Sequence, residues 1–299
     1  MAGSANSIVI SPVNVLWRIE ASEQVDFAGL TGLDVKGKFF NISTAKDAIL
    51  NYVWGDDSIE ADPAPAGRVG IDFTVVGDSD TASTLATACA AAIDALGGYS
   101  ASASGTVVTI YRAAVGLVTD TVDVDMGVVI TVCRRGKDFD LGLLQGDIEM
   151  GAAPAYFTVT AQQSGLTPRA ALYQGVESLE ASTTMLETQN SQLKEIYGLY
   201  GSDGFVPSGG TEVFGIGTSK QGQNLLVDAA RLVFKDVNAV DDSNNRTFML
   251  AIPKPDSLVF SGENPRTLSV TWQGFIDDQI DSRVSALNFG DETQSGLRI

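Results

Sequence analysis

The chain of 299 residues contains no histidine, and this absence limits the chemistry that it can perform. Histidine serves most often as a general base near neutral pH, because its ordinary pKa is about 6.5. Without it, a Ser-His-Asp or Cys-His catalytic arrangement is impossible. The absence excludes most hydrolase mechanisms, and we predict neither a catalytic residue nor an enzyme activity.

Cysteine is almost as scarce. The two cysteines, Cys89 and Cys133, each lie in an apolar pattern with no second cysteine at metal-ligand spacing beside them. Isolated cysteines of this kind behave as small buried hydrophobes. We therefore expect two buried thiols and no metal site. A chain with two cysteines is also not a disulfide scaffold of the secreted type, which favours an intracellular place of folding.

Basic side chains are few. The 19 lysines and arginines are outnumbered by 37 aspartates and glutamates, so the formal net charge is -18. No run of lysine or arginine gathers the positive charge in one place. Such a chain is repelled by a phosphate backbone, and we expect no specific binding of nucleic acid.

Long hydrophobic runs are missing as well. No apolar stretch approaches the roughly 18 residues that span a bilayer, so we predict no membrane insertion. The first seven residues lack both a basic region and an apolar core, which predicts no signal peptide. Hydrophobic residues make up 44% of the chain and charged residues 19%, values typical of a globular protein with room for two domains.

The clearest local pattern is a helix over residues 81–96 that ends at Gly97-Gly98. Its apolar residues recur on one face of a 3.6-residue repeat: Leu85, Cys89, Ala92, Ile93 and Leu96. Alternating strands flank it at 71–76 and 106–111, and Ser104-Gly105 suits a tight hairpin turn after Tyr99. We expect the flanking strands to form one sheet that buries the helix.

The remaining chain reads mostly as β. Before the helix we predict an edge or bulged strand over 8–18, a passage between units over 27–37, strands over 38–42 and 48–54, and an irregular loop over 56–67. After it we predict strands over 156–160 and 176–184, a helix over 185–200, a long loop over 201–217, strands over 225–234 with 246–252 and 258–260 with 267–276, and an extended tail.

These elements predict a mainly β (α+β) fold with two domains. Residues 1-35 and 137-299 form a discontinuous β domain with one helix, and residues 36-136 form a small inserted β-α-β-β domain. The tryptophans Trp17, Trp54 and Trp272 each sit in a strand pattern, which predicts that they pack in the core.

Two glycine-rich segments have part of the pattern of a cofactor site but lack its key residues. Residues 217–224 have the glycine spacing of a phosphate-binding loop, but Gln223 and Asn224 occupy the positions of its Lys and Ser or Thr. Residues 215–217 lack the third glycine of a dinucleotide fingerprint. We predict no cofactor-binding residue.

Acidic clusters are the remaining candidates for a metal site. Residues 120–127 alternate Asp120, Asp123 and Asp125 with apolar positions, but they lack the glycine and glutamate of an EF-hand loop. We expect a solvated loop with Val122 and Val124 facing inward. The pairs Asp56-Asp57, Asp241-Asp242 and Asp277-Asp278 are expected to be solvated turns, and we predict no metal ligand.

One part of the chain resembles a known module. The run from Gly37 to Trp54, followed by residues 62–72, the 81–96 helix and residues 99–109, is similar to a β-α-β-β module found in virion proteins of tailed bacteriophages. The resemblance covers about a third of the chain, and such modules occur as insertions in tube, sheath and fibre proteins. It implies a virion structural protein.

The outer segments resemble the tail tube proteins of tailed bacteriophages, through residues 176–201 and the pair 224–236 with 247–253. Members of that family form a β-sandwich or barrel flanked by a helix, assemble as rings of six and stack into a hollow tube that conducts the genome. The resemblance implies the virion tail as location, the host cytoplasm as place of synthesis, and contacts with copies of itself, other tail proteins and a sheath. An acidic lumen would repel DNA and let it slide without specific binding.

The resemblance also implies where contacts lie. We expect residues 201–222 and both chain ends to contact neighbouring subunits, so truncation before Val13 should abolish assembly and preserve folding. The inserted domain should project from the outer surface, as an ornament or a contact to the host or sheath. Two alternatives stay open: a head decoration protein and, from another class, a carbohydrate-binding module or enzyme, which the lack of histidine disfavours.

Overall fold

The computed structural model describes residues 13–45, 50–160, 168–186, 190–200, 220–237, 245–259, 266–277 and 287–289. The protein is mainly β, with its strands arranged in open sheets. It divides into two compact units. Unit 1 contains residues 1–17, 140–225 and 231–299, and unit 2 contains residues 18–139 and 226–230.

Unit 2 contains two sheets. In the first, β1 lies between β6 and β8, β5 pairs with the far side of β6, and every pairing is antiparallel. In the second, the strand order is β4-β3-β2-β7, and the β3–β4 pair is parallel. The strands are β1 (Val13–Asp26), β2 (Phe39–Ser43), β3 (Leu50–Asp56), β4 (Val69–Thr74), β5 (Tyr99–Ser104), β6 (Val107–Val115), β7 (Val122–Asp123) and β8 (Val129–Arg134), with β9 (Lys137–Asp140) pairing with β1.

The predicted helix is confirmed as α2 (Ala82–Asp94). The Thr81 hydroxyl accepts a hydrogen bond from the Thr84 backbone N–H at 3.3 Å, which caps the first turn. Beyond the last turn, Gly98 has a φ of +95°, a conformation that glycine adopts without strain. The hairpin is confirmed too, since β5 and β6 pair around Gly105.

The expected single sheet under the helix is wrong. The strand before α2 is β4, which pairs in parallel with β3, whereas the strands after α2 pair with β1 in the other sheet. The helix packs against β4, β5 and β6 and so contacts both sheets. The parallel pairing with β3 is what separates β4 from the hairpin.

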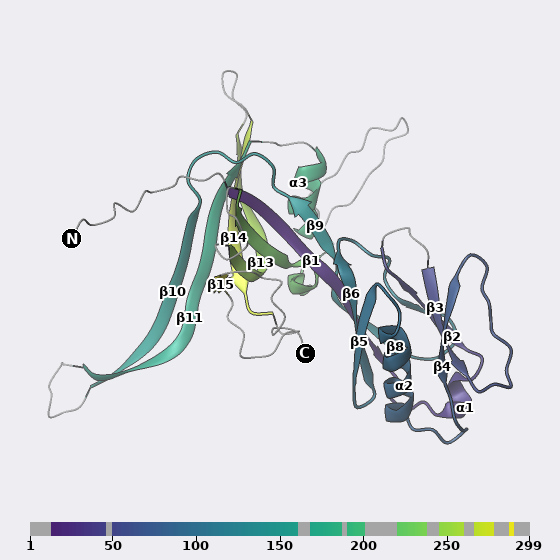
Figure 1. The fold of residues 1–299 in the computed structure, drawn as a ribbon. Helices are drawn as coiled ribbons and strands as arrows, with labels where there is room; N and C mark the ends of the chain where they lie inside the picture. Colours follow the sequence, from purple (N-terminus) through teal and green to yellow (C-terminus); the bar gives the residue numbers. More distant parts are fainter. Residues whose placement is uncertain are drawn as a thin grey trace, which may run out of the picture. The chain divides into compact units, whose positions relative to one another are not determined.

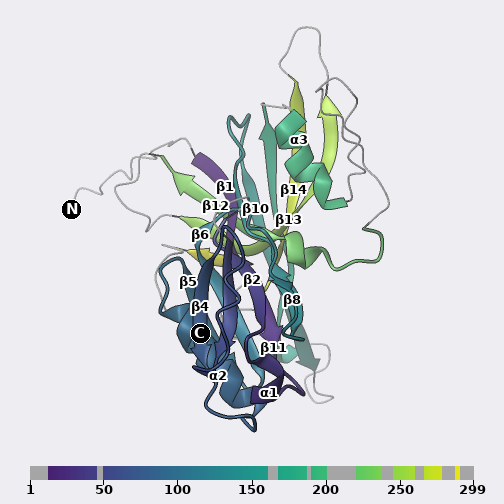
Figure 2. The same ribbon diagram turned by 90° about the vertical axis from the view of Figure 1, so that its right-hand side faces the viewer.

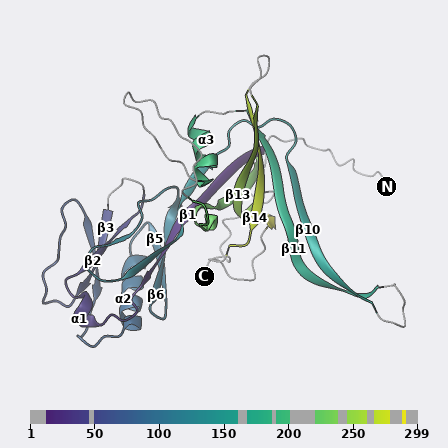
Figure 3. The same cartoon turned by 180° about the vertical axis from the view of Figure 1, so that it is seen from behind.

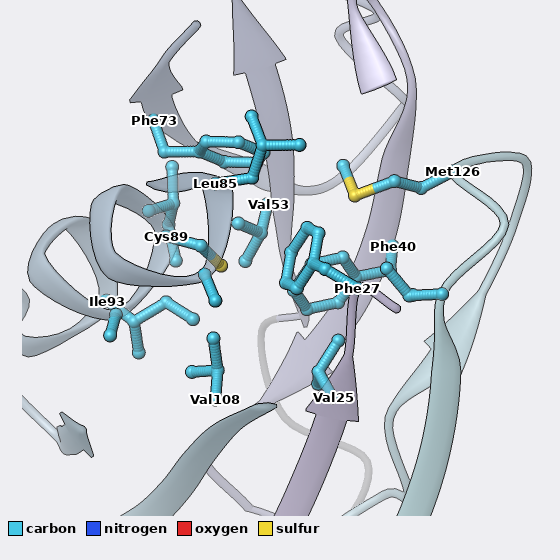
Figure 4. Close-up of a cluster of buried hydrophobic side chains, with 14 of the residues drawn as sticks. Val25, Phe27, Phe40, Val53, Phe73, Leu85, Cys89, Ile93, Val108 and Met126 are labelled. Atoms are coloured by element: carbon cyan, nitrogen blue, oxygen red, sulfur yellow. The ribbon is translucent and has the colours of Figure 1, made fainter. Parts of the chain in front are cut away.

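The core of unit 2 lies between the two sheets and α2 (Figure 4). Phe27, directly after β1, and Phe73 of β4 meet edge to face with ring centroids 6.1 Å apart. The buried face of α2 supplies residues four apart in sequence, namely Leu85, Cys89 and Ile93. Apolar residues from strands of both sheets and from the β7–β8 connection complete the cluster: Val25, Phe40, Val53, Val108 and Met126.

Residues 18–35, which the sequence pattern places in the outer domain, pack in unit 2. They include the second part of β1 and the short helix α1 (Gly32–Val35), which begins with a capping box between Thr31 and Asp34. A side chain at Gly32 would place its Cβ 1.9 Å from the Gly77 carbonyl oxygen. Glycine at this position therefore permits the close contact between α1 and the β4–α2 connection.

Unit 1 is built on the strand order β10-β11-β14-β13-β12-β1, with β15 paired to β13. Strands β10 and β11 are longer than predicted, and residues 246–259 form one strand, β13, rather than two. Residues 225–228 are a 3-10 helix (η3) instead of a strand start. The strands are β10 (Glu149–Thr160), β11 (Pro168–Met185), β12 (Ala230–Asp236), β13 (Arg246–Val259), β14 (Thr267–Phe275) and β15 (Leu287–Phe289).

The predicted helix over 185–200 is observed in a shorter form, as α3 (Asn190–Tyr197) followed by the 3-10 helix η2 (Gly198–Tyr200). Met185 instead ends β11. Ile196 and Leu199 are buried, and the Tyr200 hydroxyl donates a hydrogen bond to the Pro253 carbonyl at 2.6 Å. These contacts hold the helix against β13 (Figure 2).

All three tryptophans are buried, as predicted. Trp17 and Trp272 meet edge to face in unit 1 with centroids 5.3 Å apart. Their indole N–H groups donate to the Ala251 carbonyl and the Thr183 hydroxyl, so neither polar group is left unpaired in the core. Residues 8–12 of the strand predicted over 8–18, the whole predicted loop over 201–217 and the C-terminal tail lie outside the described residues.

Candidate functional site

Among the described residues, no three His, Cys, Asp or Glu side chains lie close enough together to hold a metal ion. In that same part of the chain, no helix is long and apolar enough to cross a membrane. The candidate sites are therefore a buried ion pair, two networks of acidic side chains and a surface of exposed apolar residues.

Unit 2 contains a buried ion pair between Glu23 of β1 and Arg112 of β6. Arg112 Nη2 lies 2.5 Å from Glu23 Oε2, and both side chains are at most 1% exposed. Thr121 donates its backbone N–H to Glu23 Oε1 at 2.8 Å and its hydroxyl to Oε2. Arg112 Nε donates to the Ser43 carbonyl at 2.6 Å. The network joins β1, β6, the end of β2 and the segment before β7.

Tyr99 extends this network. The Arg112 guanidinium lies 5.3 Å from the centre of the Tyr99 ring, and the Tyr99 hydroxyl donates to Asn51 Oδ1 at 2.9 Å. Burial raises the pKa of Tyr99 to about 12, an effect that the nearby Arg112 charge reduces. The groups of the network join β1, β3, β5, β6, the end of β2 and the segment before β7 to one another. Its chemistry is therefore structural.

The sequence held a signal for this pair that our prediction missed. Arg112 follows Val108 and Ile110 at every second position of one strand, and Glu23 precedes Val25 in the same way. Successive odd or even positions of a strand share one face, so each charge lies on the buried face. A charge placed there requires a partner.

A second network links three connections at one end of unit 2. Lys36 Nζ lies 3.1 Å from Asp57 Oδ2 and 2.5 Å from Asp78 Oδ1. Asp57 also accepts backbone N–H bonds from Glu60 and Ile59, which together with Lys36 lower its pKa to about 2. The pKa of Lys36 is raised in turn, by Asp78 and then Asp57.

The expectation that Asp56-Asp57 is a solvated pair is wrong, because the Asp57 side chain is 7% exposed and ion-paired, and Asp56 accepts the Ser58 backbone N–H at 2.7 Å. Asp277 is also buried, at 5% exposure, contrary to expectation. Asp241, Asp242 and Asp278 lie outside the described residues.

The side chains of the acidic loop 120–127 face the opposite way to the prediction. Val122 and Val124 are exposed, whereas Met126 is buried in the core. Asp123 accepts the backbone N–H groups of Met126 and Gly127 at 3.2 and 3.1 Å. The bends that these bonds hold turn Met126 inward. Asp125 likewise accepts the Phe39 backbone N–H at 2.9 Å, whereas Asp120 lies 3.8 Å from the Arg135 guanidinium.

The two cysteines are buried and neither forms a disulfide, as predicted. Complete burial of Cys89 raises the pKa of its thiol, which keeps it protonated and unreactive. The Cys133 thiol lies 3.8 Å from the Thr131 carbonyl. The segment weighed as a phosphate-binding loop is described only from Lys220 onward, where residues 220–222 form a turn.

Unit 1 carries a surface that the sequence reading missed. Strand β11 pairs with β14 only over residues 180–185, whereas it pairs with β10 along residues 168–182. The rest of the hairpin extends past the sheet as a two-stranded ribbon (Figures 1 and 3). We call this part, residues 152–160 and 168–179, the ribbon.

Apolar side chains on the ribbon are open to solvent. Phe157 and Leu172 are directly opposite each other in the pairing of β10 with β11, and they are 57% and 58% exposed. Val176, nearer the sheet, is also exposed. A two-stranded hairpin is marginally stable by itself, because it has no second layer on which to bury its side chains. The ribbon is therefore the strongest candidate for a contact surface in unit 1.

Comparison with known proteins gives no family for this chain. No protein-family model and no curated protein sequence matches it at a significant level.

Proposed function

We propose that the chain is a virion structural protein, the subunit of a bacteriophage tail tube. Copies of it form stacked rings, six to a ring as in the family that it resembles, around a channel that conducts DNA. It has no enzymatic role. It is made in the host cytoplasm and resides in the tail of the virion.

The ribbon is the observation that carries this proposal. It exposes Phe157 and Leu172 as a cross-strand pair on a hairpin that leaves its own sheet. Burying such a pair against another molecule stabilises by about 25 cal/mol per Å² of apolar surface removed from water. In this proposal the molecule that covers the pair is a second copy of the chain, so the ribbon favours polymerisation.

The charge of the chain supports a channel role. With 37 acidic and 19 basic side chains, the subunit carries a net charge of -18. A wall with this balance repels the DNA backbone, so the genome passes without specific binding.

Other tail proteins, including a sheath where one is present, are the remaining partners. The segment 201–222 and the chain ends keep their predicted role as subunit contacts, and they lie almost entirely outside the described residues. In this proposal unit 2 is an ornament on the tube.

Electron microscopy of the purified full chain across a concentration series tests the proposal. We expect hollow tubes to form above a threshold concentration. The double variant Phe157→Ser with Leu172→Ser should stay monomeric at concentrations at which the natural chain polymerises, because the apolar contact is lost.

A matched control carries two serines at exposed aliphatic positions of unit 2, Leu33→Ser with Val76→Ser, and should form tubes normally. Compact monomers of the natural chain at every concentration would overturn the proposal. Trimers that bind capsids would favour the head decoration alternative. If the ribbon variant formed tubes as well as the natural chain, the tube proposal would stand, but the ribbon would not be the contact that drives assembly.

A further inference from the structure

Five exposed aliphatic side chains of unit 2 lie outside its strands. Leu117 and Val124 are in the β6–β7 and β7–β8 connections, and the other three belong to segments that Lys36 joins. Leu33 is in α1, Ile59 in the β3–β4 connection and Val76 in the β4–α2 connection, and they are 64%, 83% and 85% exposed. Aliphatic side chains in turns gain nothing for folding when they stay in water. Their presence there calls for another cause.

The β3–β4 and β4–α2 connections meet α1 at one end of unit 2 (Figure 1). Lys36, which follows α1, reaches Asp57 of one connection and Asp78 of the other. The Leu33 backbone N–H donates to the Asp78 carbonyl at 3.2 Å. We call residues 31–36, 57–60 and 75–80 the apex.

The backbone of the apex is held firmly. Gly32 abuts the Gly77 carbonyl, where no side chain would fit. The Asp80 carboxylate accepts the backbone N–H groups of Val76 and Gly77 at 2.7 and 3.2 Å. Because these bonds fix the connections before any partner arrives, binding through the apex would cost little ordering of the backbone.

The charge around the three aliphatic side chains selects the partner. The apex contains five carboxylates and one ammonium group, from Asp34, Asp57, Glu60, Asp78, Asp80 and Lys36. Such a rim is repelled by nucleic acid, by an anionic membrane surface and by the apex of a second copy. It complements an apolar protein site surrounded by lysine or arginine.

We propose that the apex docks a second protein by placing Leu33, Ile59 and Val76 in an apolar site of that protein rimmed by basic side chains. The exposed carboxylates of the apex, Glu60 and Asp78, face that rim and steer the encounter. The inference does not depend on the tube, since no apex residue belongs to the ribbon.

A designed peptide tests this surface on the full chain. The probe is an 18-residue helical peptide with leucine on one face and lysine on the other, titrated into chain labelled at Ile, Leu and Val methyl groups. The ribbon variant Phe157→Ser with Leu172→Ser is the background, so that polymerisation does not interfere. We expect saturable NMR shifts at the methyl groups of Leu33, Ile59 and Val76.

Two comparisons decide the outcome. The triple variant Leu33→Ser, Ile59→Ser, Val76→Ser should bind the peptide at least tenfold more weakly with an unchanged melting temperature, because these side chains are exposed. A peptide with glutamate in place of lysine should not bind.

Equal binding by the triple variant, or shifts spread over the whole surface, would overturn the proposal, as would tight binding of the glutamate peptide. Should the triple variant melt early, the single variant Ile59→Ser replaces it, with at least a twofold loss of affinity expected and no loss counting against the proposal.

Discussion

Unit 2 and the ribbon of unit 1 differ in the burial of their apolar side chains. In unit 2, Phe27 is fully buried between two sheets and a helix. On the ribbon, Phe157 lies on a two-stranded hairpin and is 57% exposed. A fold with an inner layer buries its apolar side chains by itself, whereas a single two-stranded layer does not. The same type of residue thus supports folding in one region and, in our proposal, association in the other.

A matched pair of substitutions gives the largest contrast between the two regions. Phe27→Ala removes a buried ring and should lower the free energy of unfolding by about 3–5 kcal/mol. Phe157→Ala removes an exposed ring and should change it by less than about 0.5 kcal/mol. Chemical denaturation of the monomeric chain measures both. Similar losses in the two variants would end the distinction between the regions.

The buried ion pair of unit 2 should also contribute to the free energy of unfolding, unlike the exposed side chains of the ribbon. Arg112→Leu leaves the Glu23 carboxylate buried without its partner and should cost about 3–5 kcal/mol. Replacing both residues together, Glu23→Leu with Arg112→Leu, should cost clearly less, since no charge is then left unpaired. Denaturation of the single and double variants measures this coupling. Additive losses would mean that the two side chains do not interact.

A smaller effect is expected where α1 touches the β4–α2 connection. Gly32→Ala would force a Cβ against the Gly77 carbonyl and should cost about 1–3 kcal/mol. Gly77→Ala is the control from the same contact, because nothing lies within 4 Å of its Cβ position. Thermal unfolding should separate the two variants. Equal melting temperatures would show that the contact is looser than described.

The smallest expected effect is a loss of stability at acidic pH. The pKa of Asp57 in the folded chain is about 2, below the ordinary 3.8, so folding favours its charged form. The stability that this adds is present above about pH 4 and is lost as the pH falls towards 2. Melting temperatures recorded from pH 5 to pH 2 should fall more steeply for the natural chain than for Asp57→Asn. Parallel curves would contradict the assignment.

Local patterns predicted the helix and the hairpin of unit 2 well. The spacing of Leu85, Cys89 and Ile93 lies within one segment, and so does the turn at Gly105. Sheet membership was not predictable in this way, because nothing in the local pattern of β3 or β4 says that the two strands pair in parallel. The same holds for β1, whose partners β6 and β8 come much later in the chain.

The residues of the candidate sites were likewise predictable where a local pattern decides their burial, and not where distant contacts decide it. The burial of Cys89 and Trp272 was predicted from their surrounding patterns. The alternating pattern around Val122 and Val124 gave a wrong prediction of which side chains are buried. Hydrogen bonds from backbone N–H groups to Asp123 decide which residue turns inward. The ribbon was missed since the length of a hairpin beyond its sheet depends on where the neighbouring strand stops pairing.

The place of β1 has a consequence for synthesis on the ribosome. Glu23 pairs with Ile110 on one side and Val132 on the other, so the central strand of unit 2 is made long before either neighbour. Pairings that span so much sequence close slowly. The nascent chain must therefore carry residues 22–26 of β1 without either neighbour until β6 has emerged, and one edge of the strand stays open until β8 follows. Val25 and Phe27 are exposed during the first interval.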